Sequence, residues 1–323
     1  MADTPGAERT AEEVIRGVDL GGRNALVTGA SGGLGAETAR VLASAGAAVT
    51  LAARDAAKAE AVAEEIRSGT GNPAVDVTAL ELTDLGSVRR CAKQWLADGK
   101  PLHLLINNAG VMACPLERTA NGWELQLATN HIGHFLLTGL LAPALEAGAP
   151  ARVVNLSSAG HRLGGVDFDD PHFERRPYDK WLSYGQSKSA NVLFSVELDR
   201  RLAPHGVHAY AVHPGMIMTE LGRHLDQQDI ADLMERTRSA GSGSGAGPSF
   251  KSVEQGAATS VWAATTPELE GRGGLYCLDC HVAEEATSDG DMDGVAPYAT
   301  DPDTAARLWA MSEEWVGERF DFS

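Results

Sequence analysis

Cysteine is scarce in this chain, which has four among its 323 residues: Cys91, Cys114, Cys277 and Cys280. So few cysteines do not indicate the disulfide framework of a small secreted scaffold. Cys277 and Cys280 have the spacing of a redox pair or of half a zinc site, but no second pair or paired-histidine motif completes a tetrahedral site. The histidines are scattered without metal-ligand spacing. We therefore predict reduced, structural thiols and no bound metal.

Long apolar runs and positive charge are also lacking. No uninterrupted apolar run approaches the ~18 residues that a transmembrane helix needs, and the polar, acidic start of the chain resembles neither a signal peptide nor a transit sequence. Lysine and arginine number 27 against 44 acidic residues, for a formal net charge of -17. This balance argues against nucleic acid and against an anionic membrane surface as partners. We expect a cytoplasmic protein with no membrane anchor and no nucleic-acid partner.

Short apolar runs of strand character alternate with alanine-rich helical stretches, at residues 56–67, 87–98 and 135–146. The alternation is typical of a parallel sheet with helices on both faces. The predicted fold class is therefore α/β, a single doubly wound Rossmann-type domain with its ligand at the carboxyl ends of the strands. We assign residues 1–18 to an N-terminal extension and residues 19–323 to the domain. Its acidic C-terminal segment starts at about residue 281.

Two long connections, near residues 160–182 and 221–250, interrupt the alternation of strands and helices. Both are predicted to lie beside the substrate cleft. We expect the two connections to supply most substrate contacts. The first carries the aromatic residues Phe168, Phe173, Tyr178 and Trp181 just before Tyr184. For the Gly/Ser-rich end of the second, a flexible connector is an equally good interpretation. For His161, a hydrogen bond within the loop is favoured over a contact with substrate.

A glycine-rich turn joins the first strand to a helix. The apolar run at residues 24–28 leads into Thr-Gly-Ala-Ser-Gly-Gly-Leu-Gly, and apolar residues at helical spacing follow. Glycines let backbone amides approach a pyrophosphate, and the helix N-terminus favours its charge. The spacing is one residue longer than the Gly-x-Gly-x-x-Gly fingerprint, and a tight structural turn is the weaker alternative. The predicted cofactor contacts in this turn are Gly29, Ser31, Gly33, Leu34 and Gly35.

The next strand, at residues 48–53, ends at Arg54. An acidic residue near this point bonds the ribose hydroxyls of NAD, whereas an arginine accommodates the 2′-phosphate of NADP. Asp55 follows one residue late, and Gly32 adds no second basic residue beside the turn. We therefore predict NADP(H) as the preferred cofactor and keep NAD(H) as the alternative. A solvated arginine at a strand end would explain Arg54 without any cofactor.

Tyr184 and Lys188 are one helical turn apart in Tyr-Gly-Gln-Ser-Lys, so both side chains lie on one face of the predicted helix. A phenol has a reference pKa of about 10, and a neighbouring ammonium favours the phenolate. The pair therefore suits a general acid with a residue that tunes its pKa. Taken alone, this spacing is common on helices.

Six motifs together resemble the short-chain dehydrogenase/reductase family, from about residue 19 to residue 280. They are TGASGGLG, NNAG at 107–110, TNHIGH around Asn130, VVNLSS ending at Ser158, YGQSK, and HPGMIMT at 213–219. The segments at residues 10–15 and 254–280 further resemble the retinol-dehydrogenase-like branch. The resemblance implies a catalytic tetrad of Asn130, Ser158, Tyr184 and Lys188.

In this family pattern Tyr184 exchanges the proton, and Lys188 lowers its pKa and holds the nicotinamide ribose. Ser158, rather than Ser157, forms a hydrogen bond with the substrate oxygen, and Asn130 helps to hold Lys188 and a water-borne proton relay. The less specific alternative is that Asn130 and Ser158 satisfy backbone groups. The pattern also counts Tyr184 and Lys188 among the cofactor contacts. It further implies contacts from Glu81 (where relatives usually carry an aspartate), Leu82, Asn108, Ala109, Gly110, Pro214, Gly215 and Thr219.

The resulting hypothesis is an NAD(P)(H)-dependent oxidoreductase that transfers a hydride between nicotinamide and a hydrophobic carbonyl or alcohol, as an NADPH-dependent ketone or aldehyde reductase. A non-catalytic cofactor-sensing protein and a reductase of an activated double bond are the alternatives. Family members are often homodimers or homotetramers through the helix that carries Tyr184, so such an assembly is a further expectation.

Overall fold

An eight-stranded sheet forms the centre of the computed structural model, which describes residues 6–217, 229, 250–288 and 294–322. The strand order is β3-β2-β1-β4-β5-β6-β7-β8. All neighbours are parallel except β7 and β8. The predicted doubly wound sheet is confirmed, with one antiparallel edge strand added. The strands are β1 (Asn24–Thr28), β2 (Ala48–Ala53), β3 (Val75–Ala79), β4 (Leu104–Asn107), β5 (Ala151–Leu156), β6 (Val207–His213), β7 (Leu275–Leu278) and β8 (His281–Val282).

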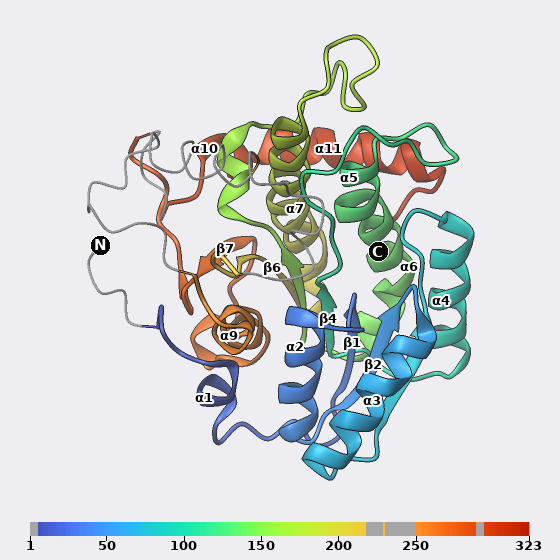
Figure 1. The fold of residues 1–323 in the computed structure, drawn as a ribbon, viewed down its shortest axis with the longest axis vertical. Coiled ribbons are helices and arrows are strands. Elements are labelled where there is room, and N and C mark those ends of the chain that lie inside the picture. Colours follow the sequence, from blue (N-terminus) through green and yellow to red (C-terminus); the bar gives the residue numbers. More distant parts are fainter. Residues whose placement is uncertain (1–5, 218–228, 230–249, 289–293, 323) are drawn as a thin grey trace.

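Helices cover both faces of the sheet (Figure 1). Alternate residues of a strand face different cores: Leu26 of β1 packs with one set of helices, and Ala25 and Val27 pack with the other. This double burial explains the uninterrupted apolar runs. One layer holds α1 (Ala11–Ile15), α2 (Gly33–Ser44), α3 (Ala56–Thr70) and α9 (Val253–Thr265); the other holds α4 (Leu85–Ala97), α6 (Gly133–Ala147), α7 (Lys180–Leu202) and α11 (Pro302–Val316).

Short helical turns link these elements. They are α5 (Leu125–Leu127), the π-helical η1 (Ala128–Ile132), the 3-10 turns η2 (Ala159–Leu163), η3 (Ala203–His205) and η5 (Pro267–Leu269), and α10 (Pro297–Thr300). Within the described ranges no helix is both long and apolar enough to cross a membrane.

The start of the chain packs as part of the domain. Thr10 caps α1 in a capping box with Glu13, whose amide donates to the Thr10 hydroxyl at 3.2 Å. Ala11 and Ile15 are buried in the core that also contains α2 and α9. The stretch assigned to an N-terminal extension is therefore integrated into the core from residue 11 onward.

The C-terminal helix α11 lies against α7, as Figure 1 shows in red. Trp309 of α11 meets Phe135 of α6 edge to face, with ring centroids 4.8 Å apart, and Phe194 of α7 at 6.1 Å. The Arg201 guanidinium lies 4.4 Å from the Trp309 ring centroid. From Ser183 to Ser195 every residue of α7 is buried, because strands cover one side of it and α11 covers another.

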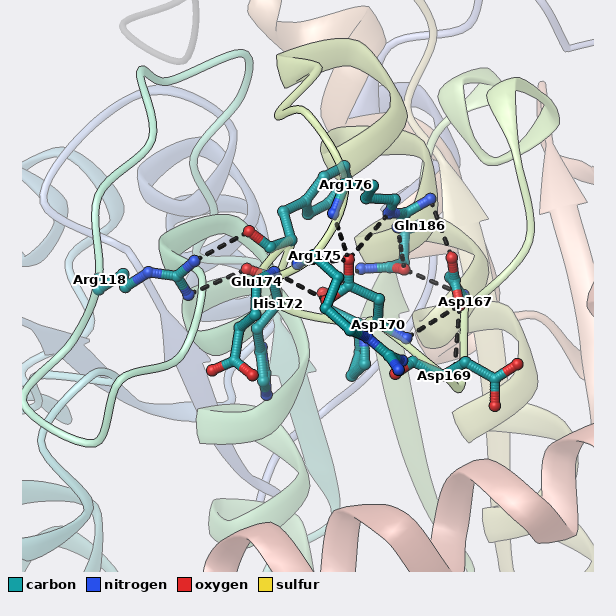
Figure 2. Close-up of polar contacts among 11 residues, drawn as sticks. Arg118, Asp167, Asp169, Asp170, His172, Glu174, Arg175, Arg176 and Gln186 are labelled. Atoms are coloured by element: carbon teal, nitrogen blue, oxygen red, sulfur yellow. Dashed lines mark hydrogen bonds and ion pairs between the residues drawn. The ribbon is translucent and has the colours of Figure 1, made fainter.

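Hydrogen bonds and ion pairs hold the connection between η2 and α7 in place (Figure 2). The Asp170 carboxylate accepts hydrogen bonds from the amides of Glu174, Arg175 and Arg176 at 2.7–3.1 Å. Arg118, from an earlier loop, donates to the carbonyl oxygens of His172 and Phe173 at 2.9 and 3.0 Å. Two aromatic side chains of this connection, Phe173 and Trp181, are each 3% exposed and belong to the protein core. Most of the second connection lies outside the described residues.

Candidate active site

A cavity of about 460 Å³ opens at the carboxyl ends of the parallel strands. It lies where the strand order reverses between β1 and β4, the position at which doubly wound sheets bind ligands. Its lining comes from the segments that follow four neighbouring strands: Gly29, Ser31, Gly33, Leu34 and Gly35 after β1, Arg54 after β2, Glu81 and Leu82 after β3, and Asn108, Ala109 and Gly110 after β4.

The glycine turn brings backbone close to this cavity. Gly29 has φ +67, and a Cβ there would lie 2.8 Å from the Cα of Ala109; one at Gly35 would lie 2.5 Å from the amide nitrogen of the Asn108 side chain. Helix α2 begins behind this turn without a side-chain cap and without an acidic residue in its first turn. Its first amides can therefore receive an anion. These features fit the pyrophosphate of a dinucleotide.

Two cations border the far end of the cavity. Arg54 lines it and lies 3.7 Å from the Glu81 carboxylate. Lys58, from the first turn of α3, lines it as well, and its Nζ would be 3.8 Å from a Cβ at Gly32. The Glu81 carboxylate also accepts hydrogen bonds from the amide and hydroxyl of Thr83, at 3.0 and 2.8 Å. The Glu81 carboxylate thus stabilises the turn after β3 and lies near Arg54. Its contact with the adenine of a cofactor stays a prediction.

The structure brings Tyr184, Ser158 and Lys188 together. Ser158 follows β5. Its hydroxyl forms a hydrogen bond with Tyr184 and accepts a hydrogen bond from the amide of Gly160 at 3.0 Å. Lys188, one turn along α7, has its Nζ 5.6 Å from the Tyr184 ring centroid and donates to the carbonyl oxygen of Leu156 at 2.9 Å. The hydroxyl of Ser157 is used differently, since it donates to the backbone carbonyl of Lys188 at 2.9 Å.

Burial controls the pKa values of this pair. Burial raises the pKa of Tyr184 to about 12, although the hydrogen bond from Ser158 acts in the opposite direction. Burial also lowers the pKa of Lys188 to about 7. This differs from the expected lowering of the phenol pKa by Lys188, because loss of water disfavours the charged form of both groups. At neutral pH Tyr184 therefore holds a proton that it can donate.

Asn130 lies in the π-helical turn η1 and is fully buried. Its side-chain oxygen accepts a hydrogen bond from the amide of Val111 at 2.8 Å. Its side-chain nitrogen donates hydrogen bonds to the carbonyl oxygen of Val111 at 3.0 Å and to the hydroxyl of Ser187 at 2.9 Å. Asn130 thus contacts Ser187, the neighbour of Lys188 in sequence, and its part in a water-borne proton relay stays a prediction. Asn130 ties the segment that follows β4 to the helix that carries Tyr184.

Residues 23–230 match the family model described as short chain dehydrogenase, and this match covers more than half of the chain. The chain is a short-chain dehydrogenase/reductase. Over 304 residues it is 45% identical to the protein named retinol dehydrogenase 12 of Homo sapiens, an alignment that covers 94% of this chain and 89% of that protein. This short-chain dehydrogenase/reductase thus belongs to the retinol-dehydrogenase-like branch and is a nicotinamide-dependent oxidoreductase.

Solved structures agree with this assignment. A crystal structure of an uncharacterised protein from Mycobacterium Paratuberculosis has a TM-score of 0.72 and 35% identity, covering 96% of this chain and 98% of that one. The RhlG/NADP active-site complex of Pseudomonas aeruginosa has a TM-score of 0.62 and 27% identity, covering 80% of this chain and 95% of that one. The predicted fold and family are both confirmed.

Four of the predicted cofactor residues are not among the residues that line the cavity. Pro214 and Gly215 follow β6, on the other side of β5, and Tyr184 and Lys188 lie on α7. Thr219 lies outside the described residues. The structure also adds residues that sequence reasoning missed. Lys58 is one of them, and its position one turn into the helix after Arg54 was the available signal.

His134 is another missed residue of this short-chain dehydrogenase/reductase. Its Nδ1 lies 3.0 Å from the carbonyl oxygen of Asn130, and its Nε2 lies 2.8 Å from the hydroxyl of Thr28. That hydroxyl accepts the amides of Asn108 and Ala109 at 2.9 and 3.0 Å. His134 therefore connects the turn of Asn130 to the end of β1, a contact between distant segments that no local pattern contains.

Proposed function

We propose that this protein is a reductase of hydrophobic aldehydes or ketones that prefers NADPH. The observation that carries the proposal is the grouping of Tyr184, Ser158 and Lys188 at the carboxyl end of β5, next to a cavity that fits a dinucleotide. Oxidation of the corresponding alcohol is the reverse reaction and uses the same residues.

Tyr184 acts as the general acid in this proposal. When bound, the reduced nicotinamide supplies the hydride that the carbonyl carbon accepts. Tyr184 donates its phenolic proton to the carbonyl oxygen, which becomes the hydroxyl of the product. Ser158 donates a hydrogen bond to the same oxygen and so stabilises the charge that develops there. A protonated Lys188 stabilises the phenolate that remains.

The preference for NADPH rests on two cations. Arg54 and Lys58 both line the end of the cavity beyond the glycine turn, where the adenosine half of a dinucleotide binds in this fold. A 2′-phosphate adds close to two negative charges there, whereas NADH presents only a hydroxyl. The NADP complex of the RhlG relative is consistent with this preference.

The hydrophobic substrate class rests on apolar side chains near the turn after Ser158. A Cβ at Gly164 would lie 3.9 Å from Leu182, and one at Gly165 would lie 3.3 Å from the ring of Tyr298. Leu182 and Tyr298 are each 39% exposed, so they offer apolar surface to a ligand that approaches Tyr184 from this side. The name of retinol dehydrogenase 12 points to a substrate of the same character.

The test is oxidation of NADPH and NADH by purified protein with a graded series of hydrophobic aldehydes and ketones. We expect turnover with NADPH, a fall in kcat of about 100-fold or more in Tyr184→Phe and Ser158→Ala, and unchanged NADPH binding in both. Ser157→Ala is the matched control because its hydroxyl faces the Lys188 backbone, and it should retain most activity. Full activity of Tyr184→Phe would overturn the acid role. NADPH binding without turnover of any carbonyl would favour the cofactor-sensing alternative.

A further inference from the structure

A buried histidine joins the turn after Ser158 to the C-terminal part of the chain. His161, in η2, has its Nδ1 2.7 Å from the carbonyl oxygen of Ser158 and its Nε2 3.0 Å from the amide nitrogen of Ala296. A carbonyl oxygen only accepts and an amide only donates, so Nδ1 carries the proton and Nε2 does not. His161 is thus held as one neutral tautomer. The loop-side hydrogen bond favoured from the sequence is present.

Neighbouring side chains strengthen the same junction. The Tyr298 hydroxyl donates to the carbonyl oxygen of His161 at 2.7 Å. Arg162, the next residue of η2, donates to the carbonyl oxygens of Ser288 and Gly294 at 2.7 and 3.3 Å. Each bond joins η2 to chain more than a hundred residues downstream. We call the described residues 294–298 the C-terminal brace.

The turn that the brace holds also positions the reacting groups. The Gly160 amide, in η2, donates to the Ser158 hydroxyl at 3.0 Å. A Cβ at Gly160 would lie 2.7 Å from the Tyr184 ring, so the turn forms the wall against which that ring packs. A displacement of η2 would therefore move the Ser158 hydroxyl relative to the Tyr184 phenol.

We propose that His161 is a positioning residue, which transmits the location of the C-terminal brace to Ser158 and so sets the distance between the Ser158 hydroxyl and Tyr184. The inference rests on the proposed function, because it assigns no step of its own to His161. The brace lies beyond residue 230, where the family model ends. Burial lowers the pKa of His161 to about 4, which agrees with a residue that exchanges no proton near neutral pH.

The experiment compares His161→Phe, His161→Asn and Tyr298→Phe in the full chain. Phenylalanine removes both hydrogen bonds of the imidazole, whereas the asparagine amide can still donate to the Ser158 carbonyl. We expect kcat to fall about 10- to 100-fold in His161→Phe, with partial rescue in His161→Asn and an intermediate loss in Tyr298→Phe. The KM for NADPH and the shape of the pH profile should stay unchanged, and the deuterium isotope effect on hydride transfer should rise.

His103→Phe is the matched control, because His103 accepts the amide of Asn24 at 2.9 Å near the amino ends of β1 and β4, away from Ser158. A second readout needs no turnover: backbone hydrogen exchange in residues 157–163 should accelerate in His161→Phe and not in His103→Phe. Wild-type kcat and isotope effect in His161→Phe, or unchanged exchange in that segment, would overturn the positioning role. If the wild-type protein reduces no carbonyl, the proposed function fails, and the exchange data still decide whether the brace holds η2.

Discussion

At the scale of single residues, the site of this short-chain dehydrogenase/reductase depends on how burial changes the charge of Lys188. The side chain is 4% exposed, and its hydrogen bond goes to a backbone carbonyl, not to a carboxylate. Burial lowers its pKa from 10.5 to about 7. The folded protein thus binds fewer protons than the unfolded chain between these two values. Burying Lys188 therefore costs no free energy of folding from its charge above pH 10.5, where the amine is neutral in both states. Stability is lost as the pH falls from 10.5 to 7, because the folded protein resists the proton that the unfolded chain binds.

We therefore predict that Lys188→Met stabilises the protein more at pH 7 than at pH 9.5. The difference between the two pH values should reach a few kcal/mol, on the order of 1.4 kcal/mol per pKa unit. Urea unfolding at both pH values measures it, and Lys93→Met, at an exposed position on α4, is the control. An equal effect of Lys188→Met at both pH values would show that Lys188 keeps an ordinary pKa in the folded protein.

Arg54 and Lys58 give a second prediction at this scale. Replacing either by alanine should weaken NADPH binding about 10-fold and leave NADH binding unchanged, because only NADPH carries the phosphate that both cations would meet. The double variant should bind both cofactors with similar affinity. Titration of each variant with NADPH and NADH measures this. An equal loss for both cofactors would assign these side chains to the shape of the cavity rather than to phosphate recognition.

At the scale of elements, the connection between η2 and α7 is a fixed structure. Arg118 bonds the backbone of His172 and Phe173, and the Arg176 guanidinium lies 4.0 Å from the Phe173 ring centroid. Gln186, in the turn of α7 that follows Tyr184, donates to the carbonyl of Pro171 at 2.7 Å. The connection is therefore attached to the helix that holds the proposed acid.

We predict that Arg118→Met lowers the free energy of unfolding by about 2 kcal/mol, since hydrogen bonds from a charged donor to buried carbonyls are lost. Hydrogen exchange in residues 167–176 should accelerate, while exchange in β1 and β2 stays as in the wild type. Arg90→Met removes an exposed ion pair with Asp84 and should cost less than about 1 kcal/mol. Equal effects of the two substitutions would mean that Arg118 does not hold the connection.

Elements with a local signal could be predicted from the sequence, and elements held by distant contacts could not. The strands at residues 24–28 and 48–53 have the predicted bounds, because strands buried on both faces are continuous apolar runs. The residues that line the cavity follow strand ends, which the motifs mark. The sequence could not show whether Phe173 and Trp181 face the cleft or the core, because an apolar side chain in a connection fits either place. Their burial, with 3% of each exposed, places both in the core.

At the scale of the whole molecule, buried neutral histidines determine how the protein responds to acid. His131, His134 and His161 are at most 1% exposed, and burial lowers their pKa values to about 3, 4 and 4. Between pH 6.5 and 4 the unfolded chain binds protons that the folded protein excludes. Stability is therefore lost as the pH falls through this window, by up to about 4 kcal/mol per pH unit for the three together.

We predict cooperative acid unfolding between about pH 4 and 6, measured by circular dichroism. The double variant His131→Leu/Ser312→Ala removes one histidine together with its partner, since the His131 Nε2 lies 2.8 Å from the Ser312 hydroxyl. Its unfolding should take up about one proton fewer. A protein whose stability is constant from pH 6.5 to 4 would contradict this account of the three histidines.

The burial of α7 has a consequence for communication between copies of this protein. Residues Ser183–Ser195 are covered by their own chain, with Trp309 of α11 against Phe194. A second copy of the chain would find little surface on this stretch, so an assembly through this helix would have to use its exposed ends, such as Leu182, which is 39% exposed. The side chains of Tyr184 and Lys188 would then not touch a neighbouring copy directly. We therefore predict hyperbolic saturation curves for cofactor and substrate, and sigmoidal curves would contradict this.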